Sequence, residues 1–115
     1  MSRIKIWNRV PDRSTLHVTV DGGTGTARGI LTVSDGTTRD FDDAALRAGV
    51  SIPLRTPKLY NLTLVLTFAA ASTMTVKAHV ALPNGNHHGQ DFEEPVTGAA
   101  GDVKTVALGV ITRQT

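Results

Sequence analysis

An antiparallel β-sandwich of seven to eight strands is the all-β fold that this sequence predicts, as a single domain over residues 1–115, with a β-barrel as the less favoured alternative. The first indication is a series of short runs in which apolar and polar residues alternate, the pattern of strands with one buried face. The second is that turn residues, mainly Gly, Asp and Pro, separate these runs at short spacing. No run of helical periodicity long enough for a crossover helix lies between them, which argues against a parallel sheet.

The strongest alternation lies between Leu59 and Leu82. Its apolar positions form two sets, Tyr60, Leu62, Leu64, Leu66 and Phe68, then Met74, Val76, Ala78, Val80 and Leu82. A helix would scatter residues of this spacing around its axis, so strands are the better interpretation. Because only the link Ala70-Ala71-Ser72 separates the two runs, we expect them to pair as an antiparallel hairpin.

The other runs complete the predicted layers. Strands are expected over the following segments: 3–10 with Ile4, Ile6 and Val10 buried, 16–20, 27–34, 37–41, 50–54 and 105–112. One short helical turn is expected near 43–48, with Asp42 or Asp43 as N-cap and Gly49 as its end. Pro53 predicts a position at a sheet edge. Residues 83–101 show no periodicity and are predicted to form a long loop. The arrangement is Ig-like only in the loose architectural sense.

Composition excludes several classes of protein. The chain has 115 residues and no cysteine, so it forms no disulfides and has no thiolate ligand or nucleophile. A formal net charge of +2 is too small to indicate nucleic acid as a partner. The first residues lack the apolar segment of a signal peptide, and no transmembrane run is present. We therefore expect synthesis in the cytoplasm or association with a virion or similar assembly.

The segment 84–94 holds the densest set of metal-ligating side chains. His87, His88, Asp91 and Glu93 could bind zinc, and the oxygen-bearing side chains could bind calcium. The spacing matches no specific metal motif, and adjacent histidines on an extended chain point apart. The alternative interpretation is a polar surface loop, with no cofactor.

The first predicted strand provides a second candidate site. Arg3, Lys5, Trp7 and Arg9 share the parity opposite Ile4 and Ile6, so we expect them on an exposed face. An exposed Trp beside cations could stack on a sugar ring. Alternatively, the cations protect an edge strand from aggregation, or the Trp is buried against a neighbouring subunit.

No catalytic motif is present: the sequence has neither G-x-S-x-G nor H-E-x-x-H. The function we predict is that of a non-enzymatic structural or interaction module. It would act as a homo-oligomer or as a subunit of a larger assembly, for example a phage, capsid or secretion-type particle. One alternative is a lectin-like carbohydrate-binding module in which calcium could assist binding. A second is a metal-dependent enzyme built on the 84–94 segment.

Overall fold

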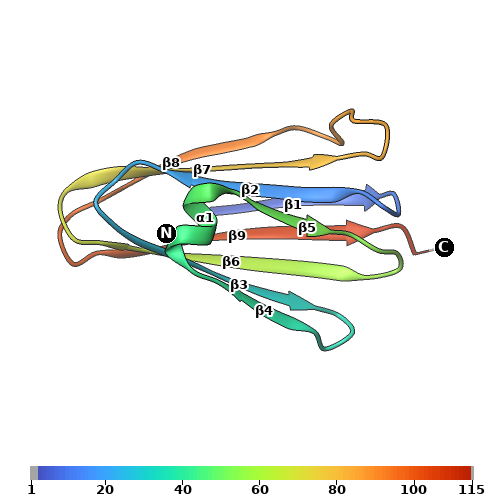
Figure 1. The fold of residues 1–115 in the computed structure, drawn as a ribbon, viewed down its shortest axis with the longest axis horizontal. Coiled ribbons are helices and arrows are strands. Elements are labelled where there is room, and N and C mark those ends of the chain that lie inside the picture. The colour runs from blue at the N-terminus through green and yellow to red at the C-terminus, as the bar shows by residue number, and fades with distance from the viewer. Residues whose placement is uncertain (1–2, 115) are drawn as a thin grey trace.

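The computed structural model describes residues 3–114, so residues 1, 2 and 115 of the predicted domain lie outside the described part. Within it, nine strands and one short helix form a sandwich of two sheets (Figure 1). The elements are β1 (Arg3–Val10), β2 (Thr15–Asp21), β3 (Gly25–Val33), β4 (Thr38–Phe41), α1 (Asp43–Ala48), β5 (Val50–Pro53), β6 (Leu59–Phe68), β7 (Ser72–Ala81), β8 (Phe92–Gly98) and β9 (Val103–Thr112). The predicted all-β sandwich is confirmed, with one strand more than the upper end of the predicted range.

The two layers differ in strand number. Sheet A has five strands in the order β1-β9-β6-β3-β4, and sheet B has four in the order β5-β2-β7-β8. Among the described strands, β1 pairs with β9 in parallel, whereas the other pairs are antiparallel. Pro53 lies at the end of β5, an edge strand, as predicted from its missing N–H.

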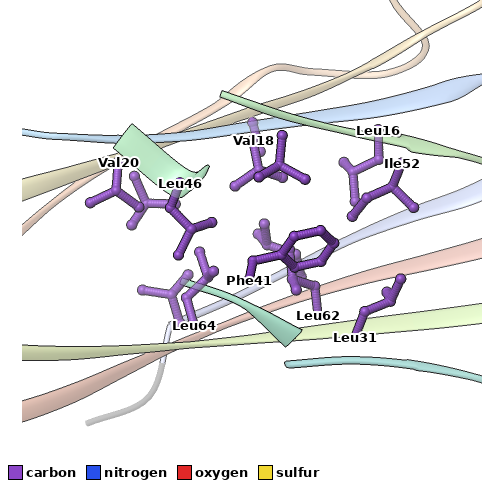
Figure 2. Close-up of a cluster of buried hydrophobic side chains, with 14 of the residues drawn as sticks. Leu16, Val18, Val20, Leu31, Phe41, Leu46, Ile52, Leu62 and Leu64 are labelled. Atoms are coloured by element: carbon purple, nitrogen blue, oxygen red, sulfur yellow. The ribbon is translucent and has the colours of Figure 1, made fainter. Parts of the chain in front are cut away.

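The core lies between the sheets and is built from the alternate residues that each strand turns inward. Figure 2 shows side chains from β2, β3, β4, α1, β5 and β6 meeting there, among them Leu16, Leu31, Phe41, Leu46, Ile52 and Leu64. Leu62, Leu64 and Leu66 of β6 are fully buried, as are Met74, Val76 and Val80 of β7. Burying each side chain of this size contributes about 1.5–3 kcal/mol to stability. The period-2 pattern therefore determines which residues of a strand face inward.

The predicted hairpin between β6 and β7 is wrong. Both strands form where the alternation places them, but β6 belongs to sheet A and β7 to sheet B. Each strand has one strongly apolar face, and two such faces can be buried by turning them toward each other as well as by pairing edges in one sheet. The link at 69–71 therefore crosses from one layer to the other.

The predicted loop at 83–101 contains β8, which the sequence interpretation missed. Glu93, Glu94 and Pro95 interrupt the apolar alternation, so only Val96 marks the buried face clearly. β8 is an edge strand of sheet B, the position in a sheet where a proline is tolerated because one side of the strand needs no hydrogen bonds.

The short helix forms as predicted. The Asp42 side chain accepts a hydrogen bond from the Ala45 amide at 2.8 Å, and Gly49 ends the helix with a positive φ of 107°. The Asp35-Gly36 turn joins β3 to β4, with Gly36 at φ 93°. Over residues 3–114 no helix has both the length and the apolar character that crossing a membrane requires.

Candidate functional site

The first part of β1, residues 3–7, faces the opposite way from its prediction, whereas Val10 is buried as predicted. Trp7 is only 2% exposed, whereas Ile4 and Ile6 are 66% and 49% exposed. The pairing of β1 with β9 shifts register between Trp7 and Val10, and Arg9 has a positive φ of 55°. This irregularity reverses the parity of the strand, so that Trp7 and Val10 can both point inward although they are three residues apart.

The indole of Trp7 lies under the segment that joins β7 to β8, residues 82–91, which we call the covering loop. Its Nε1–H donates to the carbonyl of Gln90 at 3.1 Å. A Cβ atom on Gly89 would lie 3.3 Å from the Trp7 ring, so the loop backbone rests directly on the indole. The expected exposed stacking platform for a sugar is therefore not formed by Trp7.

The three cations predicted beside Trp7 have different surroundings. Arg3 Nε lies 2.6 Å from Glu94 Oε1 of β8, so this half-buried ion pair joins the edges of the two sheets. The Lys5 ammonium lies 5.5 Å from the centre of the Trp7 ring, within cation–π range. Arg9 is exposed. The structure thus groups Arg3 and Lys5 with Trp7 at the rim between β1 and β8.

The four predicted metal ligands do not converge. His87 Nδ1 lies 2.8 Å from Asp91 Oδ1, but His88 points to the other side of the chain, where its Nε2 donates to the carbonyl of Asn8 at 2.7 Å. Glu93 is exposed on β8, opposite Lys77 of β7. Over residues 3–114, no three His, Asp or Glu side chains are placed to hold one metal ion.

The outer face of sheet B brings together three histidines that the sequence interpretation treated separately. His17 of β2 and His79 of β7 are paired across the sheet, and their ring centres are 4.8 Å apart. His87 stacks on the other side of His79, with ring centres 4.1 Å apart and the planes inclined by 11°. We call His17, His79 and His87 the histidine row. Predicting the row would have required the register of β2 with β7, which cannot be read from the sequence pattern.

Both ends of the histidine row are hydrogen-bonded. The Ser51 hydroxyl lies 3.0 Å from His17 Nδ1, and Asp91 lies beside His87. Burial is the largest cause that lowers the pKa of His79, followed by the nearby His87 and His17, while Asp91 opposes the shift. Since imidazole lone pairs lie in the ring plane, stacked rings do not aim them at a common point.

The outer face of sheet A has different chemistry. Its exposed large apolar side chains are Ile4, Ile6, Ile30, Leu59, Val103 and Ile111. The described residues that β3, β6 and β9 turn outward include a single charged side chain, Arg28, which pairs with Asp40 of β4 at 3.0 Å. Threonines and small residues fill the remaining positions.

Cross-strand neighbours make this face continuous. Ile4 of β1 is in register with Ala107 of β9, Ala107 with Thr63 of β6, and Thr63 with Ile30 of β3. The next row contains Ile6 beside Gly109, and a Cβ atom at Gly109 would lie 3.5 Å from Ile6 Cγ1. The Ile6 side chain therefore lies over the glycine, whose missing side chain permits this close approach. We call this surface the sheet A apolar face.

Acidic side chains line a hollow of about 450 Å³ beside α1. They already have structural roles. Asp42 caps the helix, Asp43 accepts from the Ala27 amide at 2.8 Å, and Asp40 pairs with Arg28. Helix capping, backbone hydrogen bonding and ion pairing thus account for these three aspartates.

These features define a class of small two-layer β-sandwich with one apolar and one histidine-bearing outer face. Comparisons with protein-family models, with curated proteins and with solved structures found no significant match to this chain.

Proposed function

We propose that this protein is a non-enzymatic interaction module that self-associates through the sheet A apolar face, as a homo-oligomer or as a repeating subunit of a larger assembly. The observation that carries the proposal is the group of exposed aliphatic side chains on a face with a single ion pair. Such residues occur singly on most monomers, but a contiguous apolar patch is typical of an interaction surface.

The size of the face suits such a contact. Five strands about 4.8 Å apart, of which β3, β6 and β9 have nine or ten residues, give a face of at most roughly 20 by 30 Å. That is about 600 Å², of the same order as the roughly 800 Å² that each partner contributes to a standard interface. Packed sheets lie about 10 Å apart, and small residues such as Ala107 and Gly109 allow a second sheet to approach.

A second copy of the chain is the occupant that this face fits best. In a two-fold contact the same patch meets itself, so apolar rows cover apolar rows. The Arg28–Asp40 pair contains both signs, so it adds no net charge to the face that such a contact would cover. A partner of strong net charge would find no complement over most of this surface.

Sedimentation velocity of the wild type and of two matched variants tests the proposal. Ile6→Glu places a charge on the sheet A apolar face and should weaken association at least about tenfold, or about 1.4 kcal/mol. Thr97→Glu adds the same charge to an exposed position of β8 in sheet B and should leave association unchanged.

A wild-type chain that is monomeric up to about 1 mM, a concentration at which even weak complexes form, would contradict self-association. Equal weakening by both variants would place the contact elsewhere. Far-UV circular dichroism of both variants should match the wild type, because both positions are exposed.

A further inference from the structure

We infer that the histidine row is an acid-sensitive latch: when His79 gains a proton, the covering loop is released and Trp7 becomes exposed to solvent. This inference is independent of the proposed self-association. It rests on the ring stacking on the outer face of sheet B and on the contacts by which the covering loop lies over Trp7.

The row has one movable member. His17 and His79 are fixed on the paired strands β2 and β7, whereas His87 belongs to the covering loop. The loop is attached to sheet B by the bridge between Ala81 and His87 and by the His88 amide, which donates to the Val80 carbonyl at 2.8 Å. Repulsion within the row therefore acts mainly on the loop.

His87 and His88 point to opposite sides of the loop and so connect two surfaces. The His87 ring lies on the histidine row, while the His88 ring reaches the Asn8 carbonyl of β1. Gly89 and Gln90, the next two residues, lie against Trp7. A movement that separates His87 from His79 therefore reaches the indole through only a few residues.

The position of His79 in the middle of the row explains why it is the trigger. Its ring has an imidazole on each side, at ring separations of 4.1 and 4.8 Å. Burial and, after it, both neighbouring imidazoles oppose a charge on this ring and lower its pKa. A proton on the middle histidine is therefore the one that the closed loop does not tolerate.

Charged groups around the row do not remove this repulsion. The titratable or charged side chains that face it from the packed elements are Asp21 and His17 of β2, Lys77 and His79 of β7, His87 and Asp91 of the covering loop and Glu93 of β8. Asp21 lies 3.3 Å from Lys77, and Glu93 is in register with Lys77. Asp21 is thus paired with an ammonium group, and Asp91 is the carboxylate that opposes the lowering of the His79 pKa.

The direction of the pH dependence follows from the depressed pKa of His79. Its ordinary value is 6.5, and burial with the neighbouring histidines holds the pKa lower while the loop is closed. The open state therefore binds more protons than the closed state. Relative to the open state, the closed state keeps its full stability above 6.5 and loses part of it as the pH falls from 6.5 to the lower value.

The fluorescence of Trp7 tests the latch directly, because the chain has one tryptophan. Between about pH 7.5 and 5, the range over which histidine gains its charge, the emission of the wild type should shift to longer wavelength and acrylamide quenching should rise about twofold or more. Far-UV circular dichroism should stay constant over the same range.

His79→Gln, which cannot gain a charge, should abolish the change. His88→Gln is the control for a loop contact without a member of the row: it alters the ring that reaches Asn8, so it should change Trp7 exposure to the same extent at pH 7.5 and at pH 5 and keep the pH-dependent change. Unchanged Trp7 emission in the wild type, or the same shift in His79→Gln as in the wild type, would overturn the inference. Should His79→Gln fail to fold, proton NMR titration of the wild-type imidazoles serves instead. A His79 that titrates above His17 and His87 would equally overturn the inference.

Discussion

The two outer faces of this sandwich cover the same core and have almost opposite chemistry. Sheet A turns outward aliphatic and threonine side chains with the single pair Arg28–Asp40, whereas sheet B turns outward the histidine row, Lys77 and Glu93. Both faces are made by the same alternation, so inward residues are fixed by packing and outward residues are free to differ. The two sheets therefore differ in their outward-facing residues and not in their inward-facing ones, which are apolar in both.

The largest predicted effect is on the free energy of unfolding, and it depends on whether the substituted residue faces inward or outward. Leu108 and Ile111 lie on the same strand, β9, but Leu108 is fully buried and Ile111 is 37% exposed. Leu108→Ala should cost about 2–5 kcal/mol of unfolding free energy because it leaves a cavity. Ile111→Ala should cost less than about 1 kcal/mol, since much of its side chain remains in water.

Urea denaturation of the two variants measures the difference. An equal loss for both would mean that Ile111 is covered, as it would be inside a tight oligomer. Repeating the measurement at low protein concentration separates these cases, because unfolding of a self-associated chain depends on concentration.

Salt should affect the two faces differently. Association through the sheet A apolar face should change by less than about twofold between 0.05 and 0.5 M NaCl, because apolar contacts are not screened. The pKa of His79 should rise toward its ordinary value over the same range, since screening weakens the repulsion from His17 and His87. Sedimentation and NMR titration at the two salt concentrations provide the comparison; a strongly salt-dependent association would assign it to a charged surface instead.

The smallest effect should come from Asp35, at the turn between β3 and β4. Hydrogen bonds from Thr37 and the Lys58 ammonium lower the pKa of Asp35 to about 2, from 3.8. A carboxyl group with a lowered pKa stabilises the folded state above pH 3.8, and this contribution is lost as the pH falls toward 2.

Asp35→Asn should therefore flatten the acid limb of the stability curve below about pH 4 and leave Trp7 emission near pH 6 unchanged. Thermal unfolding followed by circular dichroism from pH 5 to 2 measures this. A change near pH 6 in this variant would show that the histidine row does not act alone in that range.

The alternation predicted most of the strands because burial depends on parity. It predicted the inward residues of β6 and β7 correctly, but it could not say that these strands face each other from different sheets. The pairing of strands is a long-range property, and a pattern with period 2 is equally satisfied by either arrangement.

The candidate sites were predicted less well, and each failure has a local cause. One irregular step at Arg9 exchanged the two faces of β1 and so buried Trp7 and exposed Ile4 and Ile6. The histidine row depends on the register of β2 with β7 and on the path of the covering loop. Neither the register nor the path of the loop can be predicted from the spacing of His17, His79 and His87 along the chain.

The parallel pairing of β1 with β9 has a consequence for how the chain acquires its structure. Figure 1 shows the strand nearest the start of the chain beside the strand nearest its end, and β9 also separates β1 from β6. During synthesis on the ribosome, β1 has no neighbour in its sheet until β9 emerges, some hundred residues later. Closing so long a loop is slow, so refolding should be limited by the arrival of this last strand.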